Sequence, residues 1–222
     1  MKNTLTAVPV APLLERLYAD AARSNALIGE LFGKLSPEER AARMSDPNAD
    51  YRAFYGRAKH IHMPVSPETG KLLYMLARAS GARAIVEFGT SFGISTVHLA
   101  AALRDNGGGK LIGTEFEPSK VAHARENVAA AGLGDLVEIR EGDALETLSR
   151  DLPASVDLVL LDGAKPLYEK ILALVAPRLR SGSLLVADNA DACPAYKALV
   201  RAPDSGYLSV PFADDVELTV KL

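Results

Sequence analysis

The sequence has one cysteine, Cys193, and no tryptophan. A single thiol excludes an intrachain disulfide and a zinc site built from several thiolates, and it is typical of a protein from a reducing compartment. We therefore expect a cytoplasmic protein and interpret Cys193 as a small apolar filler of the core.

An excess of positive charge is also missing. Lys and Arg total 25 and Asp and Glu total 28, which gives a formal net charge of −3. Proteins that bind nucleic acid usually carry a basic face or stripe. The charge balance therefore favours a small-molecule ligand over a nucleic acid.

Long apolar runs are absent as well. The longest uncharged run, Phe88 to Leu103, contains glycines and hydroxyl side chains and is shorter than the ~20 apolar residues of a membrane-spanning helix. Near the start, Pro9 and Pro12 interrupt the apolar stretch that follows Lys2. We expect neither a signal peptide nor a membrane segment.

From about Ala82 onward, short apolar runs alternate with amphipathic helical patterns, and 48% of the 222 residues are hydrophobic. The runs predict buried strands at Ala84–Phe88, Lys110–Thr114, Leu136–Ile139, Val156–Leu161 and Ser183–Ala187, and a terminal antiparallel hairpin of Tyr207–Val210 and Val216–Val220. Strands separated by helices form parallel sheets with helices on both faces. The expected fold is α/β, a doubly wound, mostly parallel seven-stranded sheet of the Rossmann-like type.

The first part of the chain has a different, helical pattern. Helices are predicted at Pro12–Ala22, Asn25–Gly33 and Pro37–Met44, the last with Ser36 as N-cap, followed by a loop at Ser45–Ala49. These helices are short and carry much apolar surface. We expect residues 1–62 to form an extension that packs on an α/β domain of residues 63–222 and contributes to a homodimer.

The first informative motif is the turn after the strand Ala84–Phe88. It contains Gly89, Thr90, Ser91, Gly93 and Ser95 and leads into a predicted helix. Backbone N–H groups of such a turn can receive an anionic ligand group; the alternative is a tight turn that binds nothing. The glycine spacing differs from the G-x-G-x-x-G of nicotinamide-dependent dehydrogenases, which weakens that interpretation.

Acidic residues follow the next two strands. Glu115 stands 26 positions after Gly89, where a carboxylate can accept hydrogen bonds from both ribose hydroxyls of a nucleoside. The alternative is a solvated strand-end carboxylate. After the third strand, the turn Glu141–Ala144 would face the adenine of the same ligand.

In this order the motifs resemble the class I methyltransferases that use S-adenosylmethionine, specifically the small O-methyltransferases of the catechol and caffeoyl-coenzyme A type. The similarity runs from about Met63 to the C-terminus. The segments that carry it are Met63–Gly70, Glu87–Ser95, Glu115, Gly142–Ala144, Asp162–Lys165 with Tyr168, and Asp188–Asn189.

The resemblance implies a cofactor site for S-adenosylmethionine. The glycine loop would hold the methionine end, Glu115 the ribose, and Asp143 with Ala144 the adenine. The complete expected cofactor set is Met63, Val65, Glu87, Gly89, Thr90, Ser91, Gly93, Ser95, Glu115, Phe116, Asp143, Ala144 and Asp162.

Oxygen-bearing side chains follow the fourth and fifth predicted strands. Asp162 comes directly after the fourth strand, and Asp188 and Asn189 come directly after the fifth. Such hard ligands suit Mg²⁺ or another divalent hard cation. The alternative is that Asp162 orients the cofactor and Asn189 caps a helix. The resemblance places Lys165 near the acceptor oxygen, so Lys165 and Asp162 are the expected catalytic residues, although lysines at helix starts are usually solvated.

The acceptor pocket departs from the family pattern. The chain has no tryptophan and carries Ala164, so tryptophan does not form an aromatic wall beside the acceptor. In addition, Ile171 stands where many relatives have tyrosine. We expect His98 and His123 to be surface residues within helices, whereas His60 and His62 flank the Met63 segment and are either structural or in contact with substrate.

The sequence thus predicts an O-methyltransferase that acts on a small phenolic or catechol-like acceptor, with a divalent metal. A metal-independent methyltransferase and a non-catalytic S-adenosylmethionine-binding module are the alternatives.

Overall fold

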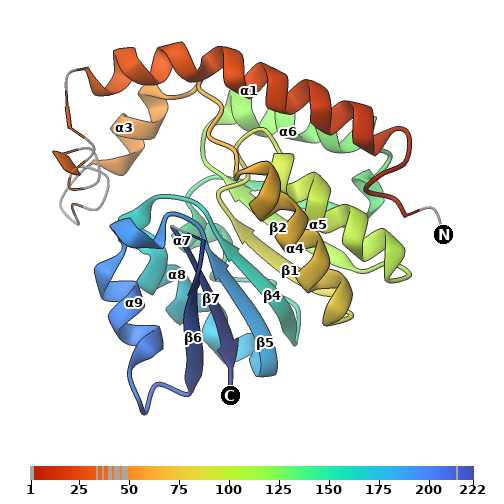
Figure 1. Cartoon of the computed structure of the whole chain (residues 1–222). Coiled ribbons are helices and arrows are strands. Elements are labelled where there is room, and N and C mark those ends of the chain that lie inside the picture. Colours follow the sequence, from red (N-terminus) through yellow and green to blue (C-terminus); the bar gives the residue numbers. More distant parts are fainter. Residues whose placement is uncertain are drawn as a thin grey trace.

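The computed structural model describes residues 3–33, 35–36, 38–39, 42, 46, 50–213 and 215–222. Within these residues, seven strands form one sheet in the order β3-β2-β1-β4-β5-β7-β6 (Figure 1). The strands are β1 (Ala84–Phe88), β2 (Lys110–Glu115), β3 (Val137–Glu141), β4 (Val156–Leu161), β5 (Leu179–Ala187), β6 (Tyr207–Phe212) and β7 (Val216–Lys221). The first five are parallel, whereas β7 runs antiparallel to β5 and β6. The predicted doubly wound sheet with a terminal antiparallel hairpin is confirmed.

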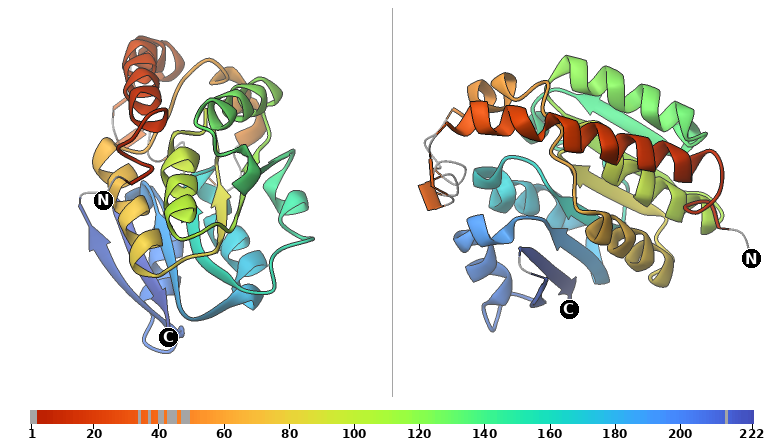
Figure 2. Two further views of the ribbon diagram at one scale, coloured as in Figure 1. Left: turned by 90° about the vertical axis from the view of Figure 1, so that its right-hand side faces the viewer. Right: turned by 45° about the horizontal axis from the view of Figure 1, so that its top comes forward.

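Helices cover both faces of the sheet (Figure 2). On one face, Ile85, Leu111 and Leu158 share a core with α1 (Val10–Phe32), α4 (Pro67–Ala79), α5 (Ile94–Asp105) and α6 (Pro118–Ala130). On the other, Val86, Ile112 and Val159 pack with α7 (Ala144–Thr147), α8 (Tyr168–Val175) and α9 (Pro194–Arg201). Because successive strand residues point to opposite faces, strands buried on both faces are continuous apolar runs, as predicted.

The chain reverses its winding direction between β1 and β4, and ligands of open α/β sheets bind in the crevice at such a point. Gly89, directly after β1, has φ +98°, and a Cβ there would lie 2.4 Å from the Asp162 carbonyl oxygen. Only glycine lets the loop approach the end of β4 this closely. The turn after β1 and the residues after β4 therefore meet at one place.

The N-terminal helices differ from the prediction. Pro12–Ala22 and Asn25–Gly33 are not separate helices, because α1 continues through both. Ser24, which could have capped a new helix, instead donates from Oγ to the Ala21 carbonyl 2.8 Å away within the helix. Leu13, Leu14 and Leu17 of α1 are buried in the sheet's core, so the predicted packing of this segment on the α/β part is confirmed.

The segment after α1 is described only in part. The capping prediction is confirmed, since the Glu39 N–H donates to Ser36 Oγ at 3.2 Å and the Ser36 N–H donates to the Glu39 carboxylate at 2.7 Å. Most of the helix predicted at Pro37–Met44 and of the loop predicted at Ser45–Ala49 lies outside the described residues. The domain boundary at residues 62 and 63 stays a prediction.

Two further helices were not predicted. In α3 (Tyr51–Arg57), Asp50 caps the first turn by accepting from the Ala53 N–H. In α4, Ser66 accepts from the Thr69 N–H, and Pro67 begins the helix. No helix in the described ranges is both long enough and apolar enough to cross a membrane.

The prediction that His98 lies on the surface is wrong, whereas His123 is exposed as expected. His98 is only 3% exposed in the middle of α5. Its Nε2 lies 3.3 Å from the Tyr18 hydroxyl of α1, and a Cβ on Gly70 of α4 would clash with its ring. Burial lowers the pKa of His98 to about 4.

Candidate functional site

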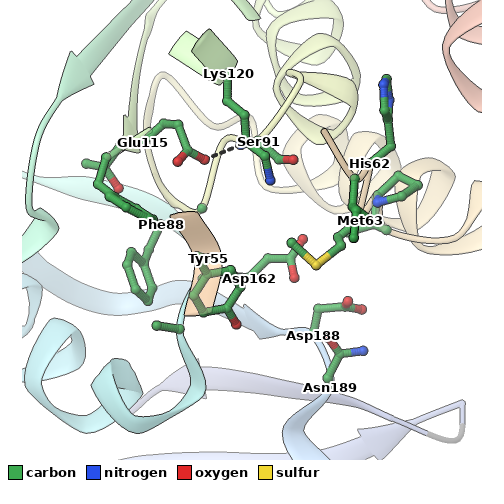
Figure 3. Close-up of a pocket in the computed structure, with 18 of the residues that line it drawn as sticks. Tyr55, His62, Met63, Phe88, Ser91, Glu115, Lys120, Asp162, Asp188 and Asn189 are labelled. Atoms are coloured by element: carbon green, nitrogen blue, oxygen red, sulfur yellow. Dashed lines mark hydrogen bonds between the residues drawn. The ribbon is translucent and has the colours of Figure 1, made fainter. Parts of the chain in front are cut away.

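A cavity of about 630 Å³ lies at the carboxyl ends of β1, β2, β4 and β5 (Figure 3). Nine of the thirteen predicted cofactor residues line it, as do all three predicted metal ligands and Lys165. The nine are Met63, Val65, Gly89, Ser91, Glu115, Phe116, Asp143, Ala144 and Asp162. Topology therefore brings together most of the side chains that the motifs singled out.

Glu115 ends β2 and organises the loop around it. Its Oε2 accepts from the Ser91 N–H at 2.9 Å, and its Oε1 accepts from the Glu117 N–H at 3.0 Å. The side chain is nearly buried and borders the cavity. Each carboxylate oxygen keeps a lone pair that can accept from a ligand hydroxyl.

Four predicted cofactor residues, Glu87, Thr90, Gly93 and Ser95, do not line this cavity. Glu87 is fully buried behind the loop and accepts from the hydroxyls of Thr90, Ser95 and Thr96 at 2.9, 2.7 and 2.6 Å. Burial raises the pKa of Glu87. These residues hold the turn in shape, and Gly93, with φ +85°, is the N-cap that precedes α5.

Asp143 lies at the end of the cavity where adenine is expected. It accepts from the Tyr51 hydroxyl at 2.8 Å, from the Leu145 N–H at 2.9 Å and from the Arg52 guanidinium. Burial opposes its ionisation, but the bonds from Arg52, Leu145 and Tyr51 outweigh it and lower the pKa of Asp143. Helix α3 is thereby fixed over this end of the cavity.

At the opposite end, Asp162, Lys165 and Asp188 form a buried charged cluster. Lys165 is 5% exposed rather than solvated. Its Nζ lies 3.4 Å from Asp162 Oδ1 and donates at 2.8 Å to the Tyr168 hydroxyl, which in turn donates at 2.7 Å to the Asp188 carbonyl. The ammonium is thus held in one position by the Asp162 carboxylate, the Tyr168 hydroxyl and the Asp188 backbone carbonyl.

The two carboxylates of this cluster and the neighbouring Asn189 bring oxygen donors that could hold a divalent cation. Burial raises the pKa of both Asp162 and Asp188, and the Asp162 charge raises that of Asp188 further, while Lys165 lowers both. Asn189 Nδ2 donates to Asp215 at 3.1 Å, which leaves the amide oxygen as a ligand atom. No group of three His, Cys, Asp or Glu in the described part of the chain could hold a metal, so a cation here depends on Asn189.

No sequence motif identified the individual residues on the N-terminal side of the cavity. Tyr18, Tyr51 and Tyr55 line it from α1 and α3, and burial raises the pKa of Tyr55. These tyrosines supply the aromatic surface that tryptophan does not. His62 also lines the cavity, with its ring stacked on Phe92 at a centroid distance of 3.7 Å, whereas His60 is exposed. Lys120, which no motif indicated, is a further lining residue.

Comparison with known proteins points to one group. Residues 86–190 match a family model described as a methyltransferase domain. A catechol O-methyltransferase from Niastella koreensis is 38% identical over 128 residues, which cover 56% of this chain and 57% of that protein. A catechol O-methyltransferase from Mycobacterium tuberculosis is 35% identical over 125 residues, 56% of either chain. The match thus spans little more than half the length of these relatives.

Solved structures extend the similarity to nearly the whole fold. An O-methyltransferase of tomaymycin synthesis from Streptomyces achromogenes, in complex with S-adenosylmethionine, has a TM-score of 0.63 at 25% identity and covers 91% of this chain and 98% of its own. An O-methyltransferase from Bacillus cereus shares the fold with a TM-score of 0.64 at 22% identity, over 92% of this chain and 99% of its own. These matches confirm the resemblance to methyltransferases that the ordered motifs indicated.

Proposed function

We propose that this protein transfers the methyl group of S-adenosylmethionine to a hydroxyl oxygen of a small phenolic or catechol-like acceptor, with a divalent cation at the acceptor end of the cavity. One observation carries the proposal. A single cavity joins the loop of Ser91 and the carboxylate of Glu115 to the buried cluster of Asp162, Lys165 and Asp188. The names of the relatives supply the catechol class.

The chain's own residues bind and orient the two reactants. Glu115 accepts from the ribose hydroxyls, and Asp143 and Phe116 border the adenine. S-adenosylmethionine supplies an electrophilic methyl on its sulfonium, and its carbon–sulfur bond breaks as the carbon–oxygen bond forms. Such a displacement needs the acceptor oxygen in line behind the methyl carbon, and a rigid cavity wall contributes through that positioning.

Asp162, Asp188 and the amide oxygen of Asn189 would hold the cation. The cation would lower the pKa of the acceptor hydroxyl and help to orient it. The cation would also balance the negative charge of the buried Asp162 and Asp188 carboxylates. Among the described residues of this cluster, Lys165 is the positively charged side chain.

Lys165 accepts the proton of the acceptor hydroxyl at Nζ. Its position is set by Tyr168, whose hydroxyl donates to the Asp188 carbonyl and therefore accepts from Nζ. A lysine that accepts a proton must be neutral when it acts. In this proposal Tyr168 orients the Lys165 side chain, and Lys165 accepts the proton.

The test is to incubate the purified protein with S-adenosylmethionine carrying an isotopically labelled methyl group, Mg²⁺ and a panel of catechols and simple phenols. We expect labelled methyl ethers and one S-adenosylhomocysteine per transfer, measured by mass spectrometry. Lys170→Met, an exposed lysine of α8, serves as the matched control for lysine variants. Binding of S-adenosylmethionine without product from any acceptor would instead favour a non-catalytic binding module.

Chelation separates the two enzymatic alternatives. Loss of turnover with a chelator, restored by added Mg²⁺, is expected of the metal-dependent enzyme. Unchanged turnover after chelation would leave a methyltransferase that works without metal, on a hydroxyl or another nucleophile.

We also propose that α1 contributes to a homodimer. One face of its first half, with Leu13, Leu14 and Leu17, is buried in the core, while Leu27 further along is exposed. Light scattering of the 222-residue chain should give twice 23.6 kDa, and Leu27→Glu should shift the mass towards the monomer. A monomeric mass for the 222-residue chain contradicts this proposal.

A further inference from the structure

Helix α3 brings into the cavity a tyrosine, Tyr55, that the mechanism above does not use. Tyr51, Arg52 and Tyr55 all line the cavity, because residues one turn apart lie on the same face of a helix. Tyr51 and Arg52 both donate to Asp143, at the end of the cavity where adenine is expected. Tyr55 therefore lies on a helix that is anchored to the cavity wall one turn earlier.

The Tyr55 side chain lies near the end of the cavity that holds Asp162. Figure 3 shows it reaching into the cavity beside Asp162. Burial raises the pKa of Tyr55, and among the neighbouring charges Asp162 raises it most. The Tyr55 hydroxyl therefore keeps its proton at neutral pH and can donate a hydrogen bond to a molecule bound at this end.

The hydroxyls of the three tyrosines that line the cavity differ in their partners. The Tyr18 hydroxyl lies 3.3 Å from His98 Nε2, and the Tyr51 hydroxyl donates to Asp143 at 2.8 Å. In the described part of the chain, the Tyr55 hydroxyl forms no hydrogen bond. A donor in a cavity wall without an acceptor in the protein is available to the molecule that fills the cavity.

The ring of Tyr55 gives this end of the cavity a flat surface. It packs against the core on the α8 side of the sheet, and Ala164 and Leu167 of that core also line the cavity. Neither of these two side chains is flat. An aromatic side chain offers a large apolar face to another ring, and it also limits the space beside it. The limit matters because the cavity of about 630 Å³ has to hold the cofactor as well as the acceptor.

We propose that Tyr55 determines the acceptor specificity of this protein, an inference that rests on the proposed function. Its ring bounds the space beside Asp162, so that a single aromatic ring fits there better than two fused rings. Its hydroxyl donates to an oxygen of the acceptor. Tyr55 has no part in proton transfer, which the mechanism gives to Lys165.

The experiment compares catechol with 2,3-dihydroxynaphthalene, which has the same pair of hydroxyls on two fused rings. Tyr55→Ala removes the side-chain ring and should raise the ratio of kcat/KM for the larger acceptor to kcat/KM for catechol by about tenfold or more. A relative gain for a larger acceptor distinguishes a role in specificity from general damage to the fold. By calorimetry, the Kd of S-adenosylhomocysteine should stay within about twofold of wild type, since the acceptor end lies apart from the nucleoside.

Tyr55→Phe keeps the ring and tests the hydroxyl. It should raise the KM for catechol about threefold to tenfold, the effect of one neutral hydrogen bond, and leave kcat and the specificity ratio near their wild-type values. Tyr74→Phe is the matched control, because the Tyr74 hydroxyl donates to Asp105 at 2.7 Å and does not line the cavity. It should change none of these quantities.

Two results overturn the assignment while the proposed function stands. One is a specificity ratio that Tyr55→Ala leaves unchanged. The other is weaker binding of S-adenosylhomocysteine by both Tyr55 variants, which would place the side chain on the cofactor. An unchanged KM for catechol in Tyr55→Phe overturns the role of the hydroxyl. If the wild-type protein methylates no catechol at all, the proposed function fails and this inference fails with it.

Discussion

Replacing Glu115 by glutamine should weaken cofactor binding at least tenfold, and the structure explains why this variant is more informative than alanine. The Glu115 carboxylate accepts from two backbone N–H groups, those of Ser91 and Glu117, at 2.9 and 3.0 Å. Glutamine keeps the length of the side chain and one of these acceptors. Alanine would leave both backbone N–H groups without an acceptor. A weaker affinity of that variant could then come either from the lost ligand contact or from collapse of the loop.

The magnitude follows from two kinds of hydrogen bond. Hydrogen bonds to a charged acceptor contribute about 1.5 to 3 kcal/mol each, and glutamine removes the charge from both bonds to the ribose. With water and the remaining amide oxygen compensating in part, a net loss of about 1.4 to 4 kcal/mol corresponds to a ~10-fold to ~1000-fold higher Kd. The backbone N–H left without an acceptor costs about 1 to 3 kcal/mol of stability separately.

Calorimetry with S-adenosylhomocysteine gives the Kd, and thermal unfolding without ligand gives the stability. Glu141→Gln is the matched control, because Glu141 pairs with Glu115 in the β2–β3 register but is exposed and does not line the cavity. It should change neither quantity. A folded Glu115→Gln variant that binds S-adenosylhomocysteine within threefold of wild type would refute the ribose assignment.

Three further outcomes are expected. In the labelled-methyl assay, Lys165→Met should lower kcat by ~10² to 10⁴-fold with little change in the Kd of the cofactor. If the variant keeps full kcat on an acceptor whose hydroxyl is not already ionised, another group abstracts the proton. Gly89→Ala should destabilise the fold by at least about 2 kcal/mol in denaturant titration, since it combines φ +98° with a contact of 2.4 Å to the Asp162 backbone; an unchanged midpoint would show that the loop can shift. His98 should make stability fall as the pH drops from 6.5 to 4, by up to about 3 kcal/mol, because in this window the unfolded chain binds a proton that the buried ring, with its pKa of about 4, does not. His98→Gln should flatten that part of the stability profile in denaturant titrations at several pH values, and an identical profile would assign the loss to other groups.

The strands could be predicted closely where they are buried on both faces. Ala84–Phe88 and Val156–Leu161 have the same bounds in sequence and structure, because a central parallel strand is a continuous apolar run with a turn at its end. Strand β5 begins at Leu179, four residues before its predicted start, and this added part contains exposed residues and Gly182. Because these first residues of β5 are exposed, they are not an apolar run and the sequence pattern did not mark them as strand. They nevertheless pair with β4, since Leu179 is in register with Val156.

Helices of the N-terminal half were harder to predict because their limits depend on packing. Nothing in Arg23 or Ser24 forces a break, and the core contacts of α1 favour continuation. Local signals were available for α4, where Ser66 and Pro67 form a strong start. His98 could have been placed inside from the same kind of signal, since α5 carries no charged side chain from Ile94 to Leu103, which is typical of a buried helix.

Some features of the site could be predicted from the order of the strands, whereas others depend on neighbours that only the three-dimensional structure shows. Residues at the carboxyl ends of parallel strands must meet at one edge, so Glu115, Asp162 and Asp188 could be grouped from the strand pattern alone. The burial of Lys165, by contrast, depends on Tyr168 and on the Asp188 carbonyl, and that of Lys120 on the Phe92 ring. Both lysines follow turns and lie at helix starts, and the sequence motifs singled out Lys165 but predicted the burial of neither. Lys165 has a carboxylate partner in the described structure and the Lys120 ammonium has none, and only the three-dimensional neighbours of the two lysines reveal this difference.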